Sequence, residues 1–306
     1  MPDSAASPRR ILISGSSGFI GTELTRQLEA DGHSVHSLVR RPPRSDREFS
    51  WSPKDGTIDL RALDGVDAVV NLAGASTGRI PWTRAYKREI LYSRVNGTRT
   101  LAEALGRASD PPRVLVNGSA VGYYGNRPGE TLDEASAKGT GFLSDVVEAW
   151  EKAARLAPSS TRVVLARTGV VVGKGGAFTP LLPLTQVGLG ARFGPGSQVW
   201  PWISLHDEAA ALRHLVFSEL DGPVNLTGPT PATAEEITRS LAKELRRWHP
   251  WAIPSFAIRL LGDAGQELLL NDQHVVPSKL TADGFVFRDS TASQAIERAF
   301  GPGGGR

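Results

Sequence analysis

Over the first two thirds of the chain, two kinds of segment alternate. One is a short run of consecutive apolar residues, and the other is a longer segment in which apolar residues recur at every fourth position. The first run, residues 10–14, leads into a glycine-rich turn, after which Ile20, Leu24 and Leu28 recur at four-residue spacing. An apolar run bounded by turn residues predicts a buried strand, and the four-residue spacing places three side chains on one helix face. The start of the chain therefore predicts a strand, a tight turn and a helix.

Further strands and helices are expected in alternation along the chain. The patterns predict strands at residues 34–39, 65–74, 113–117, 162–167 and 222–227, and helices at 85–108, 140–157, 208–219 and 233–245, with Asp207 as N-cap of the third. Such alternation is typical of a parallel sheet covered by helices on both faces. We therefore predict an α/β fold with a doubly wound parallel sheet of the Rossmann type.

The composition changes at residue 173, where glycine-rich stretches at 173–176 and 188–196 bracket the apolar segment 181–184. Loops longer than about 12–15 residues in a compact domain are usually functional, so this one is expected to cover part of a ligand cleft. The predicted domains are a nucleotide-binding domain at 10–172, completed by about 205–230, and a smaller C-terminal α/β lobe at 173–204 and 231–300. Residues 1–9 and 301–306 are expected to be disordered tails.

The glycines of the first turn fall at every third position. Gly15 is expected to let the chain turn, Gly18 to let the backbone approach a pyrophosphate, and Gly21 to let the helix lie close to the strand. The helix N-terminus behind them carries roughly half a positive charge and binds phosphate readily. Since a strand precedes the motif and a helix follows it, the pattern favours dinucleotide binding over a purely structural turn.

Arginine follows the second predicted strand. Arg40 lies about 20 residues beyond the glycine turn, where an acid would bind the ribose 2′-hydroxyl of NAD and an arginine suits the 2′-phosphate of NADP. The pattern therefore favours NADP(H), and the alternative is a solvated basic turn. Leu72, Ala73 and Gly74 end the next buried strand and are expected to line the coenzyme.

Composition narrows the function further. The chain has no cysteine, which excludes disulfides and a cysteine nucleophile, and its six histidines show no metal-ligand spacing. The 35 basic and 32 acidic residues leave a net charge of +3 without a dense basic run, so we expect no nucleic-acid partner. No segment reads as a membrane span or secretory signal. We expect a cytoplasmic protein, monomeric or homodimeric, with a small-molecule substrate and no membrane or metal partner.

Four motifs, at residues 15–21, 71–74, 119–125 and 167–171, together resemble an extended short-chain dehydrogenase/reductase. Residues 202–207, 273–277 and 284–285 resemble its atypical branch of epimerase family proteins, which carries a C-terminal segment of unknown function. The resemblance covers residues 10–300 and implies an NADP(H)-binding sheet of order 3-2-1-4-5-6-7. The coenzyme contacts that it implies are Gly15, Ser17, Gly18, Phe19, Ile20, Arg40, Leu72, Ala73, Gly74, Glu89, Arg94 and Val171. For Glu89 and Arg94 the pattern alone equally allows surface ion pairing.

The catalytic pair of that family is absent. Its Tyr and Lys, four residues apart, would fall at Leu143 and Val147, neither of which can titrate. Ser119 and Tyr124 (or Tyr123) are the candidates for a rebuilt catalytic site, and lining roles without chemistry are the alternative. Two functions therefore stay open: an NADP(H)-dependent oxidoreductase or epimerase-like enzyme, and a non-catalytic NADP(H)-binding sensor or scaffold.

Overall fold

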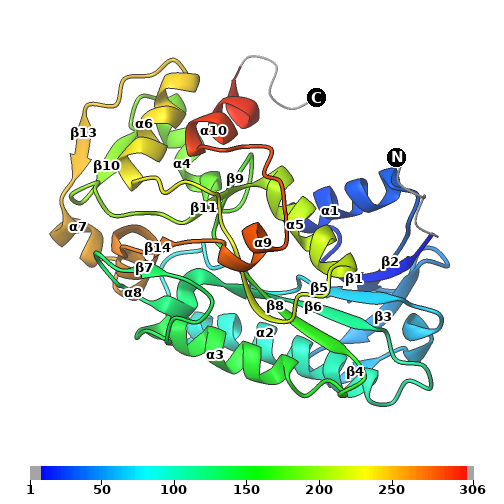
Figure 1. Cartoon of the computed structure of the whole chain (residues 1–306). Coiled ribbons are helices and arrows are strands. Elements are labelled where there is room, and N and C mark those ends of the chain that lie inside the picture. Colours follow the sequence, from blue (N-terminus) through cyan, green and yellow to red (C-terminus); the bar gives the residue numbers. More distant parts are fainter. Residues whose placement is uncertain (1–7, 302–306) are drawn as a thin grey trace.

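The computed structural model describes residues 8–301 and is built on one eight-stranded sheet (Figure 1). The strand order is β12-β8-β6-β5-β1-β2-β3-β4, and only β4 at the edge runs antiparallel. The strands are β1 (Arg10–Ser14), β2 (Ser34–Val39), β3 (Glu48–Ser52), β4 (Thr57–Ile58), β5 (Ala68–Asn71), β6 (Val114–Ala120), β8 (Arg162–Thr168) and β12 (Gly222–Leu226). The seven parallel strands have the order 3-2-1-4-5-6-7, which confirms the predicted doubly wound sheet.

Helices cover both faces of this sheet. On one face α1 (Phe19–Ala30) packs against α5 (Leu205–Phe217), and on the other α2 (Arg84–Leu105) packs against α3 (Phe142–Ala154). The alternating side chains of β1 divide between the two cores, since Ile11 and Ile13 lie with α1 and α5 whereas Leu12 lies with α2. Both faces are therefore buried, which explains the continuous apolar runs in the sequence.

A second lobe with its own apolar core lies beyond the carboxyl ends of the strands. Its elements are α4 (Phe178–Gln186), β10 (Ala191–Phe193), α6 (Ala234–Glu244), β13 (Trp251–Ile253), α7 (Ser255–Arg259), α8 (Asp263–Gly265), the π-helix η3 (Gln266–Leu270) and α10 (Ala292–Phe300). Two further small sheets pair β9 (Val170–Val172) with β11 (Trp202–Ser204), and β7 (Thr131–Leu132) with β14 (His274–Val275). The 3-10 helices η1 (Leu60–Leu63) and η2 (Val121–Tyr124) and helix α9 (Ser278–Ala282) complete the described elements.

The structure differs from the sequence-based predictions in three places. Strand β3 has no predicted counterpart, because its apolar residues Phe49 and Trp51 alternate with polar ones over only five positions. The glycine-rich segment after residue 173 is not one loop, since it contains α4 and β10. The N-cap of α5 is Ser204, whose hydroxyl accepts the Asp207 N–H at 3.1 Å, so the prediction of Asp207 as the cap was wrong. Of the predicted tails, residues 1–7 and 302–306 lie outside the described range.

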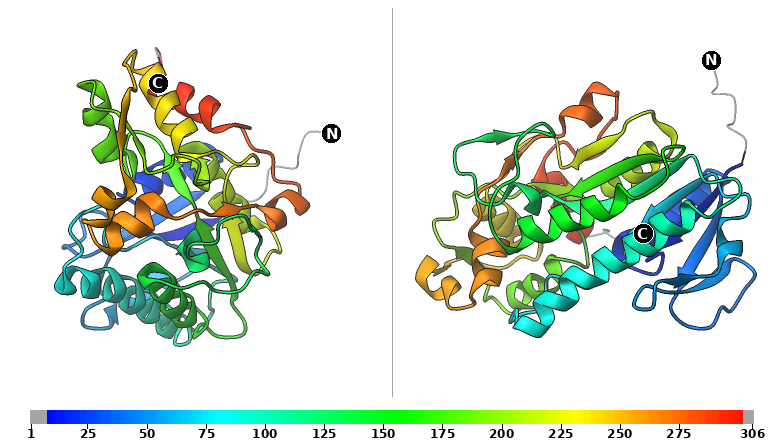
Figure 2. Two further views of the ribbon diagram at one scale, coloured as in Figure 1. Left: turned by 90° about the vertical axis from the view of Figure 1, so that its left-hand side faces the viewer. Right: turned by 90° about the horizontal axis from the view of Figure 1, so that it is seen from below.

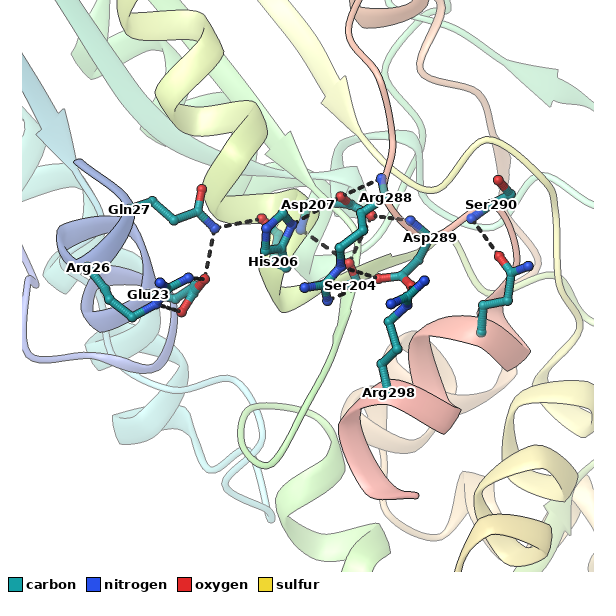
Figure 3. A network of polar contacts seen from close by, with 11 residues as sticks. Glu23, Arg26, Gln27, Ser204, His206, Asp207, Arg288, Asp289, Ser290 and Arg298 are labelled. Carbon is teal, nitrogen blue, oxygen red and sulfur yellow. Dashed lines mark hydrogen bonds and ion pairs between the residues drawn. The ribbon is translucent and has the colours of Figure 1, made fainter. Parts of the chain in front are cut away.

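Asp207 instead fastens the C-terminal segment to the sheet domain (Figure 3). Its buried carboxylate accepts the backbone N–H groups of Arg288 at 2.9 Å and Asp289 at 3.0 Å, and the Ser204 hydroxyl at 2.9 Å. Burial alone would raise the pKa of Asp207, but these hydrogen bonds and the one to His206 outweigh it and hold the pKa below its ordinary value. The charged carboxylate is therefore the form that joins the two parts of the fold.

Replacing Asp207 by Asn should lower the free energy of unfolding by roughly 2–4 kcal/mol, because an amide cannot accept from all three donors as an anion does. Urea unfolding at pH 7 measures this. The control is Asp31→Asn, which breaks the exposed pair with Arg213 and should cost about 0–1 kcal/mol. Equal losses in the two variants would contradict the assigned role of Asp207.

Candidate coenzyme site and the polar network beneath it

The turn between β1 and α1 is closed by backbone contacts that only glycine permits. Gly15 has φ +77°, and its carbonyl accepts the Gly18 N–H at 2.9 Å. A Cβ on Gly21 would lie 2.2 Å from that same carbonyl oxygen, and a Cβ on Gly15 would lie 3.0 Å from the Leu72 backbone. Gly21 therefore lets α1 lie against the turn, as the sequence predicts. Gly15 lies close to the backbone at the end of β5.

The N-terminus of α1 fits an anionic group. Its N-cap is Gly18, no side chain caps the helix, and its first turn holds no acidic residue. Ser17 and Gly18 are exposed at this end. Backbone N–H groups and the positive end of the helix dipole are thus left to a ligand, and phosphate is the group that such an end holds best.

The start of the glycine-rich segment lies against this turn. Cβ atoms on Gly173 and Gly175 would lie 2.7 Å and 2.6 Å from the Phe19 ring, and one on Gly176 would lie 3.4 Å from it. Phe19 is the first residue of α1, so the segment after β9 is held close to the helix N-terminus by an aromatic ring. The absence of side chains at Gly173 and Gly175 permits this approach.

The two arginines after β2 differ in their partners. Arg41 makes a bidentate ion pair with Glu48, with distances of 2.7 Å and 2.6 Å. Arg40 is exposed and, among residues 8–301, makes no ion pair. Because Leu38 is level with Ser14 in the parallel ladder, Arg40 follows β2 at the same edge as the glycine turn. Of these two arginines, it is therefore Arg40 whose guanidinium is available to a phosphate there.

The segment that follows β5 contacts a second guanidinium, that of Arg94. The Arg94 side chain donates to the Ala75 carbonyl at 2.9 Å, lies 5.1 Å from the Trp150 ring and would meet a Cβ on Gly74 at 3.3 Å. Burial lowers the pKa of Arg94 to about 10. Glu89 is exposed, and neither Glu89 nor Arg94 has an ion pair within the described residues. Val171 is buried in β9.

A buried polar network lies under the carboxyl ends of β6 and β8. Ser119 donates to Glu151 at 2.7 Å, and Arg167 makes a bidentate pair with the same carboxylate at 2.8 Å and 3.0 Å. Arg167 also donates to the Tyr124 hydroxyl at 3.0 Å, and that hydroxyl donates to Asn225 at 2.7 Å. Both candidate catalytic hydroxyls are therefore engaged. Glu151 and Asn225 have no predicted role in the sequence analysis, because only the fold brings these segments together.

Tyr123 and Tyr124 are in contrasting states. Tyr124 is fully buried, and burial raises the pKa of its phenol to about 12. The Tyr123 ring lies 3.5 Å from the Arg167 guanidinium, its side chain is half-buried, and its hydroxyl makes no hydrogen bond within the described residues. Of the two tyrosines, Tyr123 is therefore the one whose phenol has no hydrogen-bond partner among the described residues.

Leu143 and Val147, the positions at which the resemblance places a catalytic Tyr and Lys, lie on α3. Leu143 covers the turn after β6, since a Cβ on Gly122 would lie 3.2 Å from it, and Val147 is buried. Glu267 of η3 caps this helix by accepting the N–H groups of Phe142 and Leu143 at 2.8 Å each. Apolar side chains therefore stand at both positions, and a carboxyl group of the second lobe caps the helix that carries them.

Glu208 of α5 is a second buried acid, and the sequence analysis did not single it out. It is fully buried, one carboxyl oxygen interacts with the Thr168 hydroxyl at 2.7 Å, and the other has no partner in the described structure. Burial raises the pKa of Glu208 to about 8. At neutral pH the carboxyl is therefore mostly protonated at the end of β8.

Glu208 should make stability depend on pH. Because its folded-state pKa lies above its unfolded value, the folded state binds more protons between about pH 4.5 and pH 8, and the free energy of unfolding falls as pH rises through this range. The slope from this one group is up to about 1.4 kcal/mol per pH unit. Urea unfolding at several pH values gives the free energy of unfolding as a function of pH. This free energy should fall less per pH unit in Glu208→Gln than in wild type or in the exposed control Glu89→Gln. Identical slopes in all three proteins would contradict the raised pKa.

Two other site types are not found in the described structure. Within residues 8–301, no three His, Cys, Asp or Glu side chains gather in a way that could hold a metal ion. None of the helices of this range is long and apolar enough to cross a membrane.

Known proteins resemble the chain over nearly its whole length. The sequence profile described as "NAD dependent epimerase/dehydratase family" matches residues 11–226, and "Domain of unknown function (DUF1731)" matches residues 253–299. "Epimerase family protein Mb2239" of Mycobacterium bovis is 44% identical over 290 residues, which cover 94% of this chain and 96% of that protein. The human "Epimerase family protein SDR39U1" is 36% identical over 284 residues, 91% of this chain and 95% of that protein.

The comparison of structures points the same way. The crystal structure of human SDR39U1 (isoform 2) with NADPH matches with a TM-score of 0.86 and 33% identity, covering 95% of this chain and 98% of that one. Complexes of MoeE5 with NAD and a UDP-sugar match with TM-scores of 0.73 and 0.72 at 22% identity, which extends the likeness of the fold alone.

Proposed function

This chain belongs to the NAD dependent epimerase/dehydratase family, and from that premise we propose that it binds NADP(H) and catalyses hydride exchange with a small substrate. Membership confirms the resemblance seen in the motifs. The observation that carries the proposal is that the N-terminus of α1, which has no side-chain cap, lies at the same edge of the sheet as Arg40, which has no ion pair among residues 8–301. The NADPH in the crystal structure of the human relative supports it.

Under this proposal the predicted contacts divide by chemistry. Gly15, Ser17, Gly18, Phe19 and Ile20 hold the pyrophosphate through backbone N–H groups. Arg40 pairs with the 2′-phosphate. The remaining contacts (Leu72, Ala73, Gly74, Glu89, Arg94 and Val171) follow the coenzyme along the carboxyl ends of β5 and β9 and the neighbouring face of α2.

Replacing Arg40 by Ala should weaken NADPH binding about 10- to 150-fold and leave NADH binding nearly unchanged, because it removes one charge-assisted contact to the 2′-phosphate, on the order of 1.5–3 kcal/mol. The matched control is Arg41→Ala, which loses a pair with Glu48 and should affect the two coenzymes alike. Fluorescence titration with both coenzymes measures the dissociation constants. An equal loss for NADPH and NADH in Arg40→Ala would contradict the assignment.

For the reaction itself, we propose that Tyr123 contacts the substrate and that the buried network orients the Tyr123 side chain. When bound, the coenzyme supplies or accepts a hydride. Tyr123 holds the free phenol and can exchange the accompanying proton, with the Arg167 guanidinium against its ring. Ser119 and Tyr124, the predicted catalytic pair, hold Glu151 and Arg167 in place through their hydroxyls.

Tyr123→Phe should lower kcat by about 10²–10⁴-fold without changing NADPH affinity, since it removes the proton donor and keeps the ring. The assay follows NADPH absorbance across a panel of carbonyl compounds, enones and nucleotide sugars. Tyr124→Phe is the comparison. The Tyr124 hydroxyl is buried in the network, so its loss should lower the midpoint temperature of thermal unfolding. A Tyr123→Phe enzyme with wild-type kcat would contradict the proposed role.

One observation favours a second function. Leu143 and Val147 cannot perform the proton transfer of the usual Tyr and Lys, which suits a protein that binds NADP(H) as a sensor or scaffold. In that case no compound of the panel would consume NADPH although the coenzyme binds. NADPH would instead alter the proteins captured with this chain or its mass in solution.

A further inference from the structure

Exposed apolar side chains concentrate on the second lobe. Nine of the fifteen large apolar side chains that are exposed among residues 8–301 lie in two segments, 184–189 and 248–261. Elsewhere such residues stand singly, as at Tyr92 and Val286. Scattered exposure is normal in a globular protein, whereas a concentration of this kind marks an interaction surface. We call the following nine side chains the apolar face: Leu184, Val187, Leu189, Trp248, Trp251, Ile253, Phe256, Leu260 and Leu261.

The two segments adjoin in space. Strand β13 pairs with β10, which follows the first segment in the chain. The Trp251 indole N–H donates to the Gly188 carbonyl at 3.1 Å, and a Cβ on Gly190 would lie 3.6 Å from the His249 ring. Strand β13 and helix α7 lie at the left edge of the molecule in Figure 1, and the left view of Figure 2 looks onto this side.

The largest side chains of the apolar face project from the lobe. Trp248, Phe256 and Leu260 are 86%, 70% and 84% exposed, so each has little contact with its own lobe. A folded partner would need a matching hollow for every projecting side chain, whereas lipid chains rearrange around an inserted group. Trp, Phe and Leu are also the residues with which peripheral segments enter the interface of a bilayer.

The backbone of the apolar face has few free donors to lose from water. Pro250 and Pro254, on either side of β13, have no N–H. In the first segment the N–H groups of Val187, Gly188 and Leu189 donate to carbonyls at the end of α4 at 3.2, 3.0 and 2.8 Å. A backbone N–H without a partner is costly in an apolar medium. These features reduce the cost of moving the face out of water.

The charged residues that border the apolar face most closely in the chain are basic. No Asp or Glu occurs from residue 152 to 206 or from residue 245 to 262. Arg246, Arg247 and Arg259 are exposed, and none of the three has an ion pair within the described residues. Basic residues beside an exposed apolar surface suit the negative potential of a membrane that contains anionic lipids.

The acids that flank these segments do not cancel this charge. Asp263 is paired with Lys87 and Glu235 with Arg239, and Glu244 is half-buried. The face is therefore positive although basic and acidic residues nearly balance over the whole chain, at 35 against 32. Complementary charge thus favours an anionic surface as the occupant of the face.

We propose that the apolar face docks on the surface of a membrane that contains anionic lipids. Its aromatic rings enter about 5–10 Å into the interface, and Arg246, Arg247 and Arg259 contact the lipid phosphates. The expectation of no membrane partner rests on the lack of a segment long enough to span a bilayer, and a peripheral contact needs no such segment. This docking goes beyond the proposed function, because the face contains none of the residues assigned to the coenzyme.

Co-sedimentation of the full chain with lipid vesicles tests the proposal. We expect binding to vesicles of phosphatidylcholine with about one third phosphatidylglycerol, and weaker binding at high salt or to phosphatidylcholine alone. Trp248→Ser should weaken binding at least about 10-fold, since it removes a projecting aromatic side chain. The control Val286→Ser alters a side chain that is 85% exposed outside the face and should bind as wild type.

A charge reversal separates a local contact from attraction by the net charge. Arg247→Glu should weaken binding to the anionic vesicles at least about 5-fold, the effect of one basic residue near the membrane surface. The matched control is Arg107→Glu, which changes the net charge equally at an exposed position after α2 and should have little effect. Equal losses in the two variants would overturn the proposal.

Tryptophan fluorescence reports insertion directly. Five of the seven tryptophans are buried, and Trp248 and Trp251 are the exposed ones. Vesicles with brominated acyl chains should therefore quench the fluorescence of wild type, and quench Trp248→Phe less. Binding without quenching would overturn the proposal, and so would binding that Trp248→Ser leaves unchanged. A face that receives a protein instead would leave both kinds of vesicle unbound, which would also overturn it.

Discussion

The close contact between Gly21 and the carbonyl of Gly15 is the constraint on which the rest of the structure depends. With no side chain between them, α1 begins directly over the end of β1, and Gly18 leaves its first turn without a cap. A larger residue at position 21 would lift the helix away from the turn and separate its N–H groups from the adjoining ends of β2 and β5. The same contact therefore sets the packing of α1 and the place where a pyrophosphate can bind.

The carboxyl ends of the central strands are stabilised by buried polar groups. Ser14 donates to Asn71 at 2.5 Å, and Asn71 donates to Asn117 at 2.7 Å, so β1, β5 and β6 are joined above the apolar core. Further along the edge, Glu151 and Arg167 form a buried ion pair. Such a pair is costly to break, because the remaining charge would be buried without a partner. Rigid strand ends follow from this, and a rigid edge is what the proposed coenzyme and substrate site requires.

The sequence predicts the sheet and the glycine turn well because each depends on local spacing, and the contact of Arg40 with a coenzyme stays a prediction. Arg40 and Arg41 look alike in the sequence, and only the fold shows that Glu48 of an unpredicted strand pairs with Arg41. Glu151 and Asn225 were missed because their partners lie 32 and 101 residues away in the chain. Glu208 was missed for another reason: an acid at the start of a helix ordinarily indicates a favourable dipole interaction, and nothing local indicates full burial. The N-cap of α5 shows the same limit, since Ser204 and Asp207 both suit that position.

Amide hydrogen exchange with and without NADPH tests the central claim most directly. The account predicts that a peptide covering residues 15–21 becomes strongly protected when NADPH is added and less so with NADH at the same concentration, because the backbone of this turn holds the pyrophosphate. Protection elsewhere with no change at residues 15–21, or no change anywhere at saturating NADPH, would contradict the account.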